Sequence, residues 1–250
     1  MKKYFSYVLL LALCYLLYIN EDSKYIVAGV GIFIIGMYFM EDGFKFFSGG
    51  ILEKLISKST NTTFKSINLG IFATAILQSS SLVSIIVISF LSAKIISLSG
   101  ALGVVFGSAV GTTATTWIVS TLGLKIDIAA FALPMIIFGV IFRFYKNKNL
   151  QGVGNILLGL GFVFLGIGYM KDGFEDLKQG INLAQFAMDG YLGIFVYALI
   201  GMIVTIIIQS SSATLALTIT ALASGQIIYI NALAIAVGAN IGTATTAAMG

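Results

Sequence analysis

The sequence predicts an all-α integral membrane protein made of two related halves. Hydrophobic residues account for 58% of the 250 residues and charged residues for 10%, whereas a soluble domain carries about 25% charged residues. Apolar runs long enough to cross hydrocarbon as helices recur along the whole chain. Motifs of the first half return in the second half in the same order, which indicates an internal duplication.

The composition argues against several kinds of chemistry. The chain has no histidine and a single cysteine, Cys14, so it lacks the usual general base and cannot form an intrachain disulfide or a cysteine metal cage. The net charge of +4 does not indicate nucleic-acid binding, because the lysines cluster between apolar runs, as topology-setting residues do. We therefore expect no enzymatic activity, no cofactor and no nucleic-acid partner.

Glycine and charge patterns divide the chain into successive segments. An N-terminal transmembrane helix is expected within residues 1–24, and we predict that it is retained, because no small-x-small cleavage site follows it. Two apolar segments interrupted by serines follow later in the chain. The expected segments are spans at about 25–40, 98–122, 128–145, 152–170 and from 230, interrupted segments at 66–97 and 191–225, and charged stretches at 41–65 and 171–190.

The duplication divides the chain into repeat 1 (residues 25–150) and repeat 2 (residues 151–250), which is truncated relative to repeat 1. Both repeats run in the order helix, charged stretch, serine-bearing segment and Gly/Thr-bearing span. Two pairs of segments match without gaps. The spacing between the two copies is one residue longer in the second pair than in the first. The matched segments are Gly31–Gly50 with Gly161–Gly180, and Thr74–Thr115 with Thr205–Thr246.

Charge placement predicts that the second repeat is inverted. If each serine-bearing segment enters and leaves the membrane on one face, a repeat has three full crossings, and an odd number inverts its copy. With a cytoplasmic N-terminus, ten of the 14 lysine and arginine residues then lie inside, which obeys the positive-inside rule. We predict an inverted-repeat transporter fold with two re-entrant hairpins and about six or seven further spans, in the cytoplasmic membrane of a bacterium.

The segments Gln78–Ser81 and Gln209–Ser212 carry the predicted chemistry. Both read Gln-Ser-Ser-Ser, and serine runs favour a helix start over a continuous helix. A helix that starts inside the membrane exposes free N–H groups and about half a positive charge, which together form an anion site. Two such starts brought together by an inverted repeat would face each other near the bilayer midplane.

The Gly/Thr elements Gly107–Thr113 and Gly238–Thr243 supply oxygen atoms near closely spaced glycines. These glycines permit either unwinding or close helix packing, and Thr and Asn oxygens suit a small hard cation. Neither Gln-Ser-Ser-Ser segment contains a lysine or arginine, and two helix ends offset only about one charge. A buried oxyanion such as phosphate, which carries between one and two negative charges, would therefore need co-bound cations. Sodium is favoured over protons, because no acid or histidine is expected in the core.

These paired motifs resemble the sodium/phosphate cotransporter type II family over about residues 25–250. The resemblance implies a sodium-coupled symporter of inorganic phosphate, with the substrate held between two re-entrant hairpins. The first Gly/Thr element departs from the family pattern, with Ser108 and Ala109 where Ala-Asn is expected. The resemblance implies phosphate contacts from Ser79, Ser80, Ser81, Ser210, Ser211 and Ser212, and sodium sites bordered by Gln78, Gln209, Thr112, Thr113, Asn240 and Thr243.

Two other functions remain open from the sequence. The chain could be a sodium symporter of a different oxyanion, or a non-transporting membrane subunit or fragment. The second alternative arises because repeat 2 lacks a counterpart of the helix around Pro134, so a partner chain or a homo-oligomer could complete the fold. Asp42 and Asp172, in the shared Met-x-Asp-Gly-Phe motif, are expected to cap helices or form turns.

Overall fold

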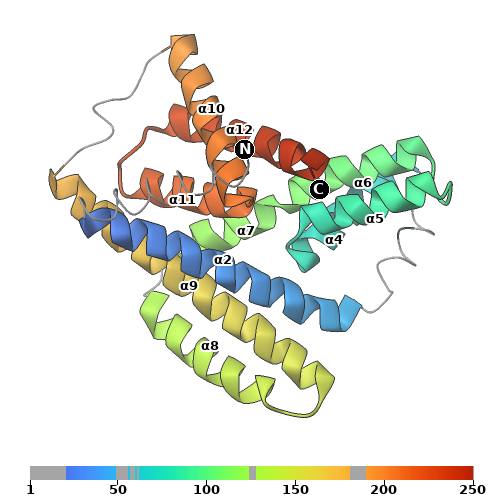
Figure 1. The fold of residues 1–250 in the computed structure, drawn as a ribbon, viewed down its shortest axis with the longest axis horizontal. Helices are drawn as coiled ribbons and strands as arrows, with labels where there is room; N and C mark the ends of the chain where they lie inside the picture. The colour runs from blue at the N-terminus through green and yellow to red at the C-terminus, as the bar shows by residue number, and fades with distance from the viewer. Residues whose placement is uncertain are drawn as a thin grey trace, which may run out of the picture.

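The all-helical prediction is confirmed for the part of the chain that the structure describes. A computed structural model describes residues 21–48, 56, 60, 62–123, 128–180 and 190–249, and these residues form helices joined by short turns (Figure 1). The predicted N-terminal helix lies outside them, and residues 21–24 of the segment assigned to it form the start of α2. The helices are α2 (Glu21–Ser48), α4 (Thr63–Leu77), α5 (Ser80–Ser92), α6 (Leu98–Gly111), α7 (Thr113–Ile118), the π-helical turn η1 (Val119–Gly123), α8 (Ile128–Arg143), α9 (Lys148–Gly180), α10 (Gly190–Ile208), α11 (Ser211–Ala223) and α12 (Tyr229–Met249).

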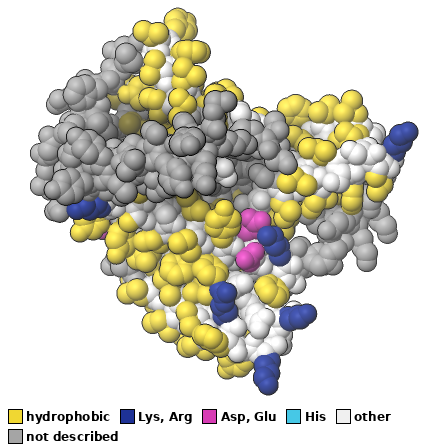
Figure 2. Space-filling model, viewed as in Figure 1, with side chains coloured by type: hydrophobic (Ala, Val, Ile, Leu, Met, Phe, Trp, Pro, Cys, Tyr) yellow, Lys and Arg dark blue, Asp and Glu magenta, His cyan; other side chains and the backbone are white. Residues whose placement is uncertain are grey.

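Four helical segments in the described ranges are long and apolar enough to cross a membrane. On the face that Figure 2 shows, hydrophobic side chains cover much of the described surface, and several lysine and arginine side chains lie at its edges. Large side chains such as Trp117 and Tyr191 are 68% and 93% exposed, which suits contact with lipid. The four segments are Ser23–Phe46, Leu98–Thr121, Lys148–Lys178 and Gly190–Ile208.

Helices α2 and α9 extend further than the sequence predicted. The charged residues after residues 40 and 170 were expected outside the spans, and Asp42 and Asp172 at caps or turns. Both predictions are wrong, because α2 continues to Ser48 and α9 to Gly180. Ion pairs four residues apart, Glu41–Lys45 and Lys171–Glu175, support each extension, since such pairs stabilise a continuous helix.

The two equivalent helices α2 and α9 pack antiparallel along a row of glycines. A methyl group added to these glycines would lie 2.6–2.8 Å from a carbonyl oxygen of the facing helix, which is too close for any side chain. The glycines recur at every seventh position, so each α-helix presents them on one face. The facing pairs are Gly29 with Gly166, Gly36 with Gly159, and Gly43 with Gly152.

The Gly/Thr elements form the second kind of close packing, between α4 and α6 and between α10 and α12. An added methyl group would lie 2.7–2.9 Å from a backbone carbonyl carbon of the neighbouring helix. The α12 helix runs unbroken through Gly238–Thr243, and α6 is followed by a one-residue turn at Thr112. The glycines therefore serve close approach rather than unwinding. The pairs are Gly70 with Val104, Gly107 with Ile67, Gly201 with Ile235, and Gly238 with Ala198.

These contacts divide the described helices other than α7 and η1 into three groups. The α4–α5–α6 and α10–α11–α12 groups are equivalent, because α5 and α11 begin and end at positions that the duplication aligns. The α2–α9 pair, with α8 packed against α9, lies alongside both groups (Figure 1). The breaks before α5 and α11 both face the middle of this arrangement, where the candidate site lies.

Candidate functional site

Both Gln-Ser-Ser-Ser segments interrupt a helix at the same place. Helix α4 ends at Leu77, just before Gln78, and α5 begins at Ser80, while α10 ends at Ile208, just before Gln209, and α11 begins at Ser211. The two glutamines adopt positive φ angles of 56° and 58°, a left-handed conformation that ends helices. The predicted helix breaks are therefore present. Their re-entrant course through a membrane stays a prediction.

The first serine of each motif caps the helix that follows. Ser79 Oγ accepts a hydrogen bond from the Leu82 amide at 3.3 Å, and Ser210 Oγ accepts one from the Ala213 amide at 3.2 Å. Each cap satisfies one amide at the helix start. The amides of the first two helical residues still have no carbonyl partner within the helix, and each capping hydroxyl keeps its proton to donate.

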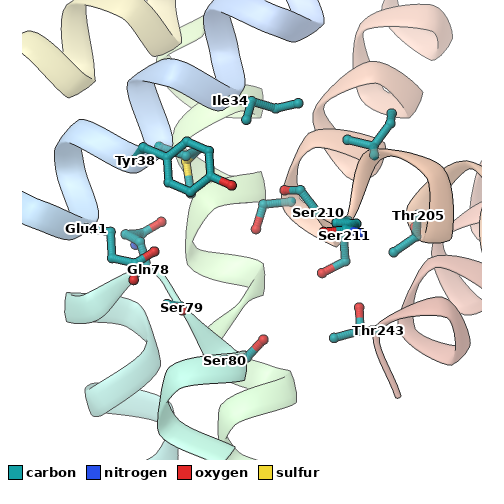
Figure 3. A pocket seen from close by; sticks show the side chains of 14 residues that line it. Ile34, Tyr38, Glu41, Gln78, Ser79, Ser80, Thr205, Ser210, Ser211 and Thr243 are labelled. Atoms are coloured by element: carbon teal, nitrogen blue, oxygen red, sulfur yellow. The ribbon is translucent and has the colours of Figure 1, made fainter. Parts of the chain in front are cut away.

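The two helix starts line one cavity of about 110 Å³, which is several times the space that a single water needs. In Figure 3, the side chains of Ser80 and Ser211 point toward one another across it. Among the described residues, the lining contains no lysine, arginine or histidine. Its residues are Ile34, Met37, Tyr38 and Glu41 of α2, Gln78, Ser79 and Ser80, and Thr205, Ile208, Gln209, Ser210, Ser211, Ser212 and Thr243.

A second cavity adjoins the first on the side of α6 and α12. The two share Ser80, Ser211 and Thr243 in their linings. Thr112 and Asn240 line the second cavity, with their side chains hydrogen-bonded to carbonyls of their own helices. The cavities together thus collect most of the predicted site residues around the two helix starts.

Two predicted site residues are not placed at these cavities. The Thr113 side chain is exposed, donates to the Val110 carbonyl at 2.7 Å, and lines neither cavity. The Ser81 side chain lies outside the described part of the structure, although its backbone belongs to the first turn of α5.

Sequence reasoning missed Glu41. The sequence led us to expect no acid in the core, yet Glu41 lines the cavity and its side chain is only 22% exposed. The signal was available, because Met40 and Asp42 belong to the repeated motif and an ionisable residue within an apolar span is a functional candidate by default. The run of charged residues that begins at Glu41 predicts a position outside the span instead.

The break before α11 has a buried hydrogen bond that the break before α5 lacks. Thr205 Oγ1 donates to Thr214 Oγ1 at 3.0 Å, behind the start of α11. The equivalents in repeat 1 are Thr74 and Val83, and the buried Thr74 hydroxyl has no partner among the described residues. A buried hydroxyl without a partner costs free energy.

Thr74→Val is therefore expected to raise stability, and Thr205→Val to lower it, each by about 1 kcal/mol. The first change removes a buried unsatisfied hydroxyl, and the second removes a donor that Thr214 uses. Thermal unfolding of the two variants in the same detergent measures both effects. Shifts of the same sign for the two variants would contradict the hydrogen-bond assignment.

The fold and the cavity define a multi-pass helical membrane protein with paired helix breaks around a small polar site. Residues 32–172 and 183–249 match the family described as Na+/Pi-cotransporter, and the chain belongs to this family. It is a family of transporters, which agrees with the expectation that the chain is not an enzyme.

Relatives with curated descriptions come from bacteria. The chain is 31% identical over 220 residues to the uncharacterized protein YqeW of Bacillus subtilis, covering 87% of this chain and 69% of YqeW. It is 28% identical over 222 residues to YjbB of Salmonella typhimurium and of Escherichia coli K12, each named as a candidate inorganic phosphate export protein. These matches cover 88% of this chain but only 40% of the length of each YjbB protein. No solved structure matches it.

Proposed function

We propose that the chain carries inorganic phosphate across the cytoplasmic membrane with sodium as the coupling ion. The observation that carries this proposal is the cavity between the two Gln-Ser-Ser-Ser helix starts. Free amides and hydroxyls there can donate to tetrahedral oxygens from two sides. Phosphate contacts are assigned to Ser79–Ser81 and Ser210–Ser212. The family and the YjbB relatives support phosphate as the substrate.

The charge balance supports coupling to a cation. Phosphate carries between one and two negative charges near neutral pH, whereas each helix start contributes about half a positive charge. Within the described residues, the lining adds no cationic side chain. An anion buried without compensation is strongly disfavoured, so phosphate binding depends on co-bound cations. Sodium sites are assigned to the oxygen-bearing residues Gln78, Gln209, Thr112, Thr113, Asn240 and Thr243, all of which except Thr113 line one of the two cavities.

The proposed mechanism uses inverted repeats. In it, α4–α5 and α10–α11 form two re-entrant hairpins that enter from opposite faces of the membrane, with the N-terminus in the cytoplasm. The antiparallel packing of the equivalent helices α2 and α9 supports this arrangement. Sodium orders the two breaks, phosphate completes the site, and one helical group then moves against the other.

The orientation of the sodium gradient is expected to set the direction of transport. Proteoliposomes that contain the purified chain should accumulate ³²P-phosphate when sodium is higher outside, and should release preloaded phosphate when the gradient is reversed. The second arm tests the export direction that the names of the YjbB relatives suggest. Because Glu41 lies in the cavity, a proton gradient in potassium buffer is the matched control.

Equal phosphate flux with and without sodium would refute the coupling. Competition by arsenate, which resembles phosphate in shape and charge, and the absence of competition by sulfate would support phosphate over other oxyanions. Dependence on a partner chain, or on a second copy of this chain, is decided by whether the purified chain transports alone and by its oligomeric state in detergent.

A further inference from the structure

Among the described residues, Glu41 is the only formally charged side chain in the lining of the cavity between the two helix starts. It belongs to α2, within the candidate span Ser23–Phe46, and its Oε1 atom lies 3.0 Å from Lys45 Nζ. The partner ammonium is 46% exposed and does not line the cavity. A carboxylate placed in this way brings negative charge to the wall of a site that otherwise attracts anions.

The end of α4 adds negative potential on the same side of the cavity. A helix C-terminus carries about half a negative charge on its unpaired carbonyls. Helix α4 ends there, beside Glu41 and Tyr38 (Figure 3). The Thr74 carbonyl, one turn before this end, is already occupied, because it accepts a hydrogen bond from the Gln78 amide at 2.7 Å. The last carbonyls of α4, such as those of Ile76 and Leu77, have no amide partner within the helix, and Gln78, which follows them, lines the cavity together with Glu41.

The two repeats differ at this position. In the alignment that relates α2 to α9, the counterpart of Glu41 is Lys171. The ion pair Glu41–Lys45 in repeat 1 thus becomes Lys171–Glu175 in repeat 2, with its charges reversed. Lys171 does not line the cavity. The carboxylate is therefore a feature of repeat 1 that the aligned position of repeat 2 does not reproduce.

We propose that Glu41 is a ligand of a sodium ion in this cavity, together with oxygen atoms at the end of α4. Carboxylate and carbonyl oxygens suit a hard cation, and ends of interrupted helices with unpaired carbonyls hold sodium in transporters. The proposal rests on sodium-dependent transport as proposed above. It adds a charged ligand beyond the neutral residues assigned there, and it makes the cation site asymmetric between the repeats.

Equilibrium binding of ²²Na+ to the purified full chain, without phosphate, tests this site. Glu41→Gln is expected to raise the sodium concentration for half-saturation by about tenfold or more, because it removes a full charge next to the ion. Glu41→Asp keeps the carboxylate and should shift the midpoint less. Elution as a single species in size-exclusion chromatography checks that each variant folds.

Asp42→Asn is the matched control. Asp42 is the neighbouring acid, contacts the same lysine at 3.4 Å, has a side chain that is 62% exposed, and does not line the cavity. Its replacement should leave the sodium midpoint within about twofold, because exposed ion pairs contribute little. If Glu41→Gln does not fold, the sodium midpoints of the other proteins decide the question. The proposal then requires that Glu41→Asp raises the midpoint above those of the wild type and Asp42→Asn.

Two results would overturn the assignment of Glu41. One is an unchanged sodium midpoint in Glu41→Gln. The other is tighter phosphate binding in that variant with the same sodium dependence, which means that the carboxylate only repels the anion. A wild-type chain that binds no sodium would instead refute the proposed coupling itself, so the two failures are distinguishable.

Discussion

Gly238→Ala is expected to prevent the chain from folding into a stable protein. The added methyl group would lie 2.7 Å from the carbonyl carbon of Ala198 and closer still to the oxygen. Both are backbone atoms of α10, so no side-chain rotation relieves the clash and α12 must move away from α10. We expect a loss of about 3 kcal/mol or more, seen as aggregation in size-exclusion chromatography.

The matched control is Gly31→Ala. Gly31 also lies inside an apolar helix, but nothing lies within 4 Å of an added methyl group there. This change should be tolerated or slightly stabilising, because alanine favours helix by about 1 kcal/mol over glycine. A Gly238→Ala variant as stable as Gly31→Ala would contradict the close packing of α10 and α12.

The double change Ser80→Ala and Ser211→Ala is expected to abolish measurable phosphate uptake. Each serine opens a helix and points its side chain into the cavity. A hydrogen bond to a charged group is worth about 1.5–3 kcal/mol, so each single change should weaken apparent phosphate affinity by roughly tenfold to a hundredfold. Sodium-driven uptake into proteoliposomes measures the loss.

Ser89→Ala is the control for this experiment. Ser89 lies on the same helix as Ser80, is exposed, and donates to the Ile85 carbonyl at 2.8 Å. Uptake by this variant should match the wild type. If the double change leaves uptake intact while folding is preserved, the serines do not contact phosphate and the proposed binding site is wrong.

The duplication made much of the site predictable. Alignment of the two repeats paired Gln78 with Gln209, and the two share a left-handed backbone and precede capped helices in the structure. Serine chemistry predicted the helix starts, because a serine can cap a helix that it begins. The inverted-repeat interpretation also predicted that the two helix starts face each other, and in the structure they line one cavity.

Charge misled the prediction at the ends of α2 and α9. Charged residues predict the end of a span, and this rule puts Glu41 outside the core. Pairs such as Glu41–Lys45 instead allow a helix to continue with its charges partly neutralised. The spacing of Glu41 and Lys45 is visible in the sequence, but which face of α2 Glu41 presents to a cavity depends on helices distant in the chain.

The glycine-lined contact between α2 and α9 has a further consequence, which concerns symmetry. Gly29 meets Gly166, and exchanging each residue for its counterpart in the other repeat gives Gly159 and Gly36, which also meet. In the same way, Gly43 opposes Ile156 and Gly173 opposes Ile26. This is an isologous interface, of the kind that two identical subunits form about a twofold axis. One half of this polypeptide thus carries a self-complementary surface, and a shorter chain with the same helix, inserted in both orientations, could pair with itself through the same residues.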